Sequence, residues 1–272
     1  MSSASVALPR TPAHAAALST QVRSLAGRAV LRTLRQPAMI VPSLVFPLFL
    51  LAVNSAGLDA ATRIPGFPTD SYLTFVLAVP FIQGALFSTM NSGQALAEDI
   101  ENGFFNRLSL TPMRGSSLIA GQLGGLVVIG LIQATVYLTI GLIAGAGFAA
   151  GPLGVPVLFA LSILISIGFG GLGMFMAIRT GSGEAVQGTF PLLFILLFFS
   201  SISMPRNLIE HEWFRTIATI NPVSYLIEGI RSLMVTGWDG EALALAFGIA
   251  ICLIAFSITI ASLSLRNRMV RT

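Results

Sequence analysis

The sequence has little charge, no lysine, a single cysteine and only two histidines. Of its 272 residues, 10% are charged and 54% are hydrophobic, whereas a soluble domain carries about 25% charged residues. This composition excludes an ordinary soluble fold. Cys252 is the only cysteine, so no internal disulfide can form. The histidines are His14 and His211 alone, which leaves too few ligands for a structural zinc site and no close pair for Cys/His catalysis.

The hydrophobic residues fall into long uncharged stretches. A helix needs about 20 apolar residues to cross about 30 Å of hydrocarbon. The first such stretch begins only near Ala38, after several arginines, so a cleaved signal peptide is not expected. We predict an all-α membrane protein with six transmembrane helices, over about residues 38–57, 72–97, 117–141, 155–178, 185–204 and 242–265.

The distribution of the arginines predicts the orientation, because basic residues accumulate in cytoplasmic loops. An even number of spans places both termini on the same side of the membrane. Eleven of the fifteen arginines lie on that side, and the four on the other side are Arg63, Arg206, Arg215 and Arg231. We therefore expect both termini in the cytoplasm.

The segment before the first span has helical periodicity. Within residues 18–36, Arg28, Arg32 and Arg35 share one face, while small and apolar residues share another. This pattern predicts an amphipathic helix lying along the inner membrane surface. A basic segment that only fixes topology explains the arginines equally well. Residues 1–17, rich in Ala, Ser and Pro, are expected to be disordered.

None of the six predicted spans contains Asp, Glu, Lys, Arg or His. Ion-coupled transporters and pumps place ionisable groups inside the membrane, so a self-powered transporter is disfavoured, as is a channel with charged rings. The sequence also has no Walker phosphate loop and no G-x-S-x-G or H-E-x-x-H motif. If the chain moves a substrate uphill, another polypeptide must supply the energy.

The connection between the second and third spans has an amphipathic pattern. Ile100, Phe104 and Leu108 recur every four residues, and we expect Glu98–Pro112 to form a short helix with acidic residues in its first turn. Such a helix suits a groove on a soluble partner. The alternative is a helix lying on lipid, which is disfavoured because anionic headgroups would repel its acidic start.

The connection after the fifth span, from Pro205 to Gly240, contains two amphipathic pieces too short to cross a membrane. We expect both pieces to lie in the outer leaflet or dip into it. Glu228 and Arg231, three residues apart, could pair on one helix face. We interpret that pair as satisfying two semi-buried charges rather than binding a substrate.

Glycines recur at four-residue spacing in the spans, as at Gly121 and Gly125, and they cluster between Gly168 and Gly173. Small residues at this spacing let helix backbones approach closely. We interpret them as packing positions, within one subunit or in a dimer, rather than as ligand contacts.

The two polar connections carry motifs that resemble those of ABC-2 type permeases of ATP-binding-cassette transporters, most closely the small daunorubicin-resistance type. The first match is Glu101-Asn-Gly103, followed by Arg107-Leu108, Leu110-Thr-Pro112 and Gly121. The second match is the segment from Asn221 to Arg231, which is similar to the family's N-P-x-x-Y-x-x-E-x-x-R pattern.

This resemblance implies a six-helix subunit in a bacterial inner or plasma membrane, paired with a second permease subunit as a homodimer or heterodimer. Two cytoplasmic ATPase subunits would bind ATP and Mg²⁺, while this chain would bind no cofactor, metal or nucleic acid and would not be an enzyme. The N-terminal helix would be a connecting helix. The coupling helix would contribute Glu98, Glu101, Gly103, Phe104, Arg107, Leu108, Thr111 and Pro112 to the ATPase contact, and the outer re-entrant helices would carry Asn221, Pro222, Tyr225, Glu228 and Arg231.

In the family the substrate path runs between the second and fifth spans. Carried onto this chain, it would be lined by Phe75, Phe81, Gln83, Phe87, Phe194 and Phe198. A Phe-rich, uncharged wall suits lipophilic drugs, antibiotics or lipids, although each Phe could instead pack or face lipid. The resemblance thus implies an exporter permease for a hydrophobic or amphipathic molecule.

Three alternatives remain beside that function. The first is a polysaccharide or glycolipid exporter, which is weakly disfavoured because three Tyr and two Trp offer few platforms for sugars. The second is a membrane assembly partner of an ATPase that transports nothing. The third is a passive channel or scramblase.

Overall fold

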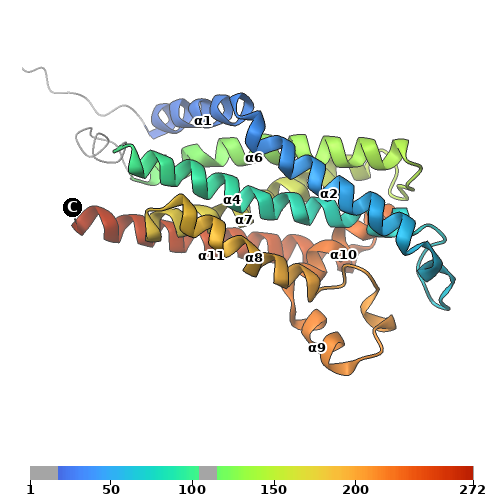
Figure 1. Cartoon of the computed structure of the whole chain (residues 1–272). Helices are drawn as coiled ribbons and strands as arrows, with labels where there is room; N and C mark the ends of the chain where they lie inside the picture. The colour runs from blue at the N-terminus through green and yellow to red at the C-terminus, as the bar shows by residue number, and fades with distance from the viewer. Residues whose placement is uncertain (1–17, 104–114, 272) are drawn as a thin grey trace, which may run out of the picture.

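The computed structural model describes residues 18–103 and 115–271, and all regular elements in these ranges are helical. Figure 1 shows the long helices side by side in an elongated bundle, with α9 projecting from its side. The predicted disorder of residues 1–17 lies outside the described residues. The helices are α1 Leu18–Arg35, α2 Pro37–Gly57, η1 Asp59–Arg63, α3 Tyr72–Val76, α4 Ala78–Glu101, α6 Gly115–Ile143, α7 Gly154–Thr180, α8 Gly183–Phe198, η2 Arg206–Leu208, α9 Glu212–Ile220, α10 Pro222–Val235 and α11 Gly240–Arg271.

Five of the described helical segments are long and apolar enough to cross a membrane. They coincide with five of the six predicted spans, although their ends differ. The segments are Pro37–Gly57, Tyr72–Glu101, Ile119–Ile143, Gly154–Thr180 and Gly240–Arg268.

The prediction for residues 185–204 is only partly correct, because α8 ends at Phe198. Its 16 residues rise about 24 Å, less than the roughly 30 Å of a hydrocarbon core. The Asn221 side chain donates hydrogen bonds to the carbonyls of Leu196 and Phe199, at 2.6 and 3.0 Å. The carbonyls at the C-terminal end of α8, which have no partner within the helix, are therefore satisfied by Asn221, and the helix ends there.

The core is centred on α4. In the most apolar stretch of Tyr72–Glu101, which joins α3 and α4, 89% of the residues are buried, whereas the corresponding values are 17% for α2 and 22% for α11. Large apolar side chains on those two outer helices are exposed, including Phe49 at 60% and Phe256 at 59%. The exposed faces of α2 and α11 therefore suit contact with lipid.

Backbone contact joins α4 to α7. A Cβ atom on Gly173 would lie 1.9 Å from the carbonyl oxygen of Thr89, so only glycine fits there. The Thr89 hydroxyl donates to the carbonyl of Phe169 at 2.9 Å, and the Ser92 hydroxyl donates to the carbonyl of Gly170 at 2.7 Å. The prediction that this glycine cluster serves packing is confirmed within the chain.

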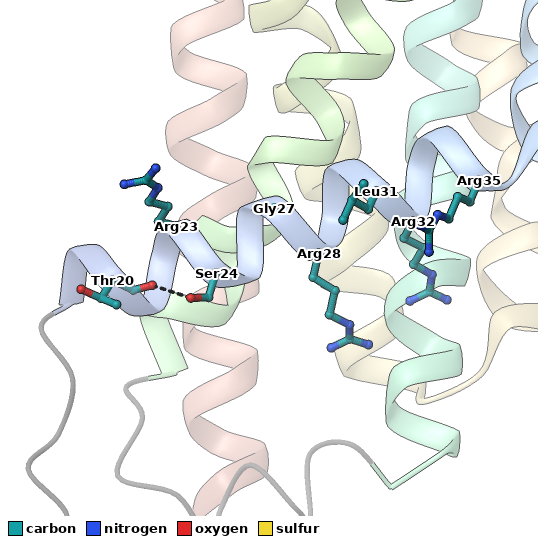
Figure 2. A pocket seen from close by; sticks show the side chains of 8 residues that line it. All are labelled: Thr20, Arg23, Ser24, Gly27, Arg28, Leu31, Arg32 and Arg35. Atoms are coloured by element: carbon teal, nitrogen blue, oxygen red, sulfur yellow. Dashed lines mark hydrogen bonds between the residues drawn. The ribbon is translucent and has the colours of Figure 1, made fainter.

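Glycines also seat α1 on α6. A Cβ on Gly121 would lie 2.3 Å from the Cβ of Leu25, and a Cβ on Gly124 would lie 2.9 Å from the Cβ of Ala26. The small and apolar face of α1 therefore packs against protein, and Ala29 on this face is 7% exposed. The opposite face of α1, which includes Leu31, is exposed (Figure 2).

We predict that Gly173→Ala lowers the free energy of unfolding by about 1–3 kcal/mol, because the new methyl group forces α4 and α7 apart. The measurement is the thermal unfolding midpoint of the chain in detergent. Gly188→Ala is the matched control, since a Cβ there meets no atom within 4 Å. A midpoint for Gly173→Ala equal to that of the control would contradict close packing at this contact.

Candidate functional site

Phenylalanines from three helices form a continuous row along one side of α4. Phe87 of α4 lies 6.0 Å from Phe46 of α2 and 5.0 Å from Phe190 of α8, measured between ring centroids. The row continues along α8, from Phe190 to Phe194 at 5.1 Å and from Phe194 to Phe198 at 6.0 Å. The rings of Phe46 and Phe194 are also in contact, with centroids 6.1 Å apart. We call these five residues the aromatic row.

The aromatic row is open to the surroundings on one side. Phe198 is 59% exposed and Phe46 is 40% exposed, whereas Phe87 is 8% exposed. Edge-to-face and tilted ring contacts of this kind contribute about 0.5–1.5 kcal/mol each beyond burial. The row can therefore hold its shape while presenting aromatic faces and edges to an apolar molecule.

The structure brings together three of the six residues predicted for the path: Phe87, Phe194 and Phe198. Phe75 lies elsewhere, packed between Phe67 and Tyr72. The other two are also separate from the row.

Phe81 contacts the ring of Tyr137 on α6, with centroids 5.5 Å apart. Gln83 is 2% exposed, and its buried Oε1 has no hydrogen-bond partner among the residues that the structure describes. Sequence reasoning also missed Phe46 and Phe190. The spacing of Phe190, Phe194 and Phe198, one turn apart on one helix, was a signal that could have found Phe190.

A cluster of charges ties α1 to the end of α4. The carboxylate of Asp99 accepts hydrogen bonds from Arg28 at 2.8 Å and from Arg32 at 3.1 Å. Arg32 also pairs with Glu98 and donates to the carbonyl of Ala95 at 3.0 Å. The Asp99 side chain is 8% exposed and that of Arg32 is 21% exposed, so these pairs are partly shielded from water.

The structure corrects the expectation that acidic residues open a helix in this connection. Glu98, Asp99 and Glu101 lie in the last turn of α4, which ends at Glu101 and is followed by Asn102 and by Gly103 with a φ of +67°. Acidic groups at a helix C-terminus interact unfavourably with its dipole. The two arginines of α1 offset that cost. The remaining predicted coupling residues Phe104, Arg107, Leu108, Thr111 and Pro112 lie outside the described residues.

Arg231, on α10, links three segments that are distant in the sequence. Its guanidinium donates to the carbonyls of Phe75, Ser201 and Ile202, at 3.0, 2.9 and 3.1 Å, and lies 3.6 Å from the centroid of the Phe75 ring. Burial lowers the pKa of Arg231, while the nearby Glu228 carboxylate and Tyr72 act in the opposite direction. An arginine stays protonated in proteins all the same, so this residue is a charged tie between α10, α3 and the segment after α8.

The predicted pair between Glu228 and Arg231 is wrong. Glu228 instead accepts two hydrogen bonds from Arg206, at 2.8 and 2.5 Å. Arg206 also lies 4.4 Å from the centroid of the Tyr225 ring. Spacing along one helix suggested the first pair, but the loop before α9 brings a second arginine to the same carboxylate.

The other predicted residues of the outer motif shape the start of α10. The Asn221 side chain caps α10 by accepting from the backbone N–H of Val223 at 2.9 Å, and Pro222 occupies the first helical position. The Tyr225 hydroxyl donates to the carbonyl of Thr219 at 2.8 Å. This outer motif therefore fixes the angle between α9 and α10.

Known proteins match this chain over most of its length. Residues 20–235 match the family described as ABC-2 type transporter. The chain is 31% identical over 229 residues to a protein of Pyropia yezoensis, covering 82% of this chain and 77% of that one. A protein of Porphyra purpurea is 27% identical over 225 residues, covering 80% and 76% of the two chains. Both relatives carry the transport-permease name ycf38.

The chain belongs to the ABC-2 type transporter family. The resemblance inferred from the two polar connections is thereby confirmed. The matched residues of this ABC-2 chain include all but the first two residues of α1, the aromatic row and the outer motif. All three features therefore lie within the family's domain.

We predict that Asp99→Asn lowers the free energy of unfolding by about 1–3 kcal/mol, because Arg28 and Arg32 lose their shared carboxylate. Thermal unfolding in detergent measures the effect, with Glu210→Gln in an exposed loop as the control for a lost negative charge. In a double-mutant cycle, Arg32→Gln should cost less in the Asp99→Asn background than in the original chain. Strictly additive costs would show that the pair contributes nothing.

Proposed function

We propose that this chain is the permease subunit of an ATP-driven exporter that moves a hydrophobic or amphipathic molecule, such as a drug, an antibiotic or a lipid, out of a bacterial cell. The aromatic row is the observation that carries the proposal. It offers an uncharged surface of ring faces and edges that reaches from a buried Phe to an exposed one. Such surfaces favour lipophilic ligands over charged ones.

The proposed topology has six spans with both termini in the cytoplasm. α8 would be the fifth span, shorter than the other five, and α9 and α10 would be the re-entrant pieces at the outer face. The distribution of the arginines supports this placement, because most of them lie in α1 or near the C-terminal ends of α7 and α11. The membrane would be the inner or plasma membrane.

The energy source would be a separate ATPase that binds ATP and Mg²⁺. No residue of this chain would take part in hydrolysis. The ATPase would seat against the residues that follow α4, and a second copy or a related permease would face the exposed side of the aromatic row. Closure of the ATPase would then push on the end of α4 and change the spacing between α4 and α8.

The proposed coupling contact is tested by Glu101→Ala combined with Phe104→Ala. We expect lower transport and weaker co-purification with the ATPase, because both side chains would lie in the contact, while the permease remains inserted in the membrane. Unchanged ATPase binding and transport would refute the contact. A permease that binds the ATPase but moves no compound would point instead to an assembly role.

The aromatic row is tested by Phe46→Ala combined with Phe194→Ala in vesicles containing the permease and its ATPase. Stimulation of ATP hydrolysis by lipophilic compounds should fall at least about tenfold, since two large apolar contacts are lost. Phe256→Ala is the control, because Phe256 is also an exposed phenylalanine, at 59%, but lies on α11, outside the aromatic row.

An equal loss of stimulation in Phe256→Ala, or no loss in the double variant, would show that the aromatic row does not line the substrate path. Stimulation by glycans rather than lipophilic compounds would identify a polysaccharide or glycolipid exporter. Movement of the compound without ATP would identify a passive channel or scramblase.

A further inference from the structure

Three arginines line one open cleft between α9, α10 and the loop that holds η2. The cleft has a volume of about 460 Å³. Its arginines are Arg206, Arg215 and Arg231, and Glu228 is the only carboxylate among the described residues that line it. Positive charge therefore exceeds negative charge within the cleft, which favours an anionic occupant.

The three arginines differ in how far the protein itself satisfies them. Arg206 donates two hydrogen bonds to Glu228, so these two charges offset each other. Arg231 donates to three carbonyls through Nε and Nη2, while its Nη1 makes no hydrogen bond with any described residue. The ion-pair partner of Arg215 is Glu212, at 3.7 Å, on a side chain that is 90% exposed. Such a long, exposed pair is weak, so Arg215 is available to another anion.

α9 directs Arg215 into the cleft and an apolar face away from it. Trp213, Ile217 and Ile220 are exposed by 60%, 40% and 76%, and their spacing places them on one side of the helix. Arg215 and Thr219, on the opposite side, line the cleft. On the proposed topology the apolar face lies in the outer leaflet. The cleft then opens at the membrane boundary, where an amphipathic molecule has its polar end.

The cleft adjoins the end of the aromatic row. The row ends at Phe198, the last residue of α8. Arg231 binds the carbonyls of Ser201 and Ile202, which follow shortly after that residue. In Figure 1 the loop that carries α9 continues from this end of α8. The apolar part of a molecule on the row and a charged end in the cleft would therefore contact neighbouring parts of one surface.

We propose that this cleft binds the anionic group, a phosphate or a carboxylate, of an amphipathic molecule. Arg215 donates hydrogen bonds to the anion, because a guanidinium group matches the oxygen atoms of both groups. Arg231 supplies further positive charge. Pro68 and Pro205, which also line the cleft, offer apolar surface to the adjoining part of the molecule. That this molecule is exported rests on the proposed function, whose substrate class is thereby narrowed to anionic amphiphiles.

The test is a calorimetric titration of the purified full-length chain, in an uncharged detergent, with 1-naphthyl phosphate, 1-naphthol and inorganic phosphate. We expect 1-naphthyl phosphate to bind at least about tenfold more tightly than the other two, because it alone offers both an anion and an apolar ring. Equal affinity for inorganic phosphate would identify a site for free phosphate, and equal affinity for 1-naphthol would show that charge is not recognised. Binding of phosphatidylglycerol without binding of 1-naphthyl phosphate would identify a resident lipid headgroup. Each of these three results would overturn the proposal.

Two variants should change the affinity for 1-naphthyl phosphate in opposite directions. Arg215→Gln should weaken binding about tenfold, since a charge-assisted hydrogen bond is lost, and Arg215→Lys should weaken it less. Glu228→Gln should strengthen binding about three- to tenfold, because Arg206 is released from its carboxylate. A purely structural role of these residues would not produce the gain.

Arg63→Gln is the matched control, because Arg63 is an exposed arginine that does not line the cleft. Its affinity for 1-naphthyl phosphate should equal that of the original chain. An equal loss in Arg63→Gln, no loss in Arg215→Gln, or a loss in Glu228→Gln at an unchanged thermal unfolding midpoint would overturn the proposal.

The titration contains no ATPase, so its outcome does not depend on transport. Unchanged anion affinity in Arg215→Gln, together with stimulation of ATP hydrolysis that depends on the aromatic row, would refute the anion site and leave the proposed function standing. Loss of anion affinity in Arg215→Gln, with no compound stimulating ATP hydrolysis, would support the anion site and refute export.

Discussion

Close contact between the backbones of α4 and α7 is the constraint on which the rest of the structure depends. The carbonyl of Thr89 occupies the space that a side chain at position 173 would need. This approach lets Thr89 and Ser92 reach carbonyls of α7, with which they form hydrogen bonds between the two helices. α4 is thereby held at the centre of the bundle, and the aromatic row and the charged cluster both occupy places fixed by this one helix.

The long apolar helices α4, α7 and α11 carry charged residues only near their ends, and the most buried charges of the described residues have specific partners. At one end, Asp99 is neutralised by two arginines from α1. At the other end, Arg231 is held by three carbonyls rather than by a carboxylate. Between the ends, α4 contributes only neutral polar groups. This division is expected where unpaired charge at membrane depth costs several kcal/mol.

Helix positions could largely be predicted from the sequence, because length and hydropathy alone mark an apolar helix. The ends could not. A boundary drawn before Glu98 assumed that charge terminates the helix, but α4 continues to Glu101 because Arg28 and Arg32, distant in sequence, supply partners. The end of α8 depends in the same way on Asn221.

Besides the helix ends, the rotation of each helix about its axis could not be predicted from hydropathy. Uniformly apolar helices such as α2 show no preferred face, so nothing in the sequence marked Phe46 as a member of the aromatic row. On α4 the spacing did carry information. Phe81 and Phe87 are six residues apart, which places them about 120° apart around the axis, on different sides of the helix. They cannot line one path, and the structure accordingly places Phe81 against Tyr137.

The ion pairs of α1 constrain how the proposed ATPase could act on this chain. Asp99 and Glu98 already bind arginines, although the Glu98 side chain is still 47% exposed, and Glu101 is exposed at the end of α4. A force applied after α4 would also reach α1 through Asp99, and from α1 it would reach α2, which begins two residues after α1 ends. Phe46 of α2 and Phe87 of α4 both belong to the aromatic row. One push at the end of α4 would therefore move two of the three helices that form the row, leaving α8 as the helix against which they shift.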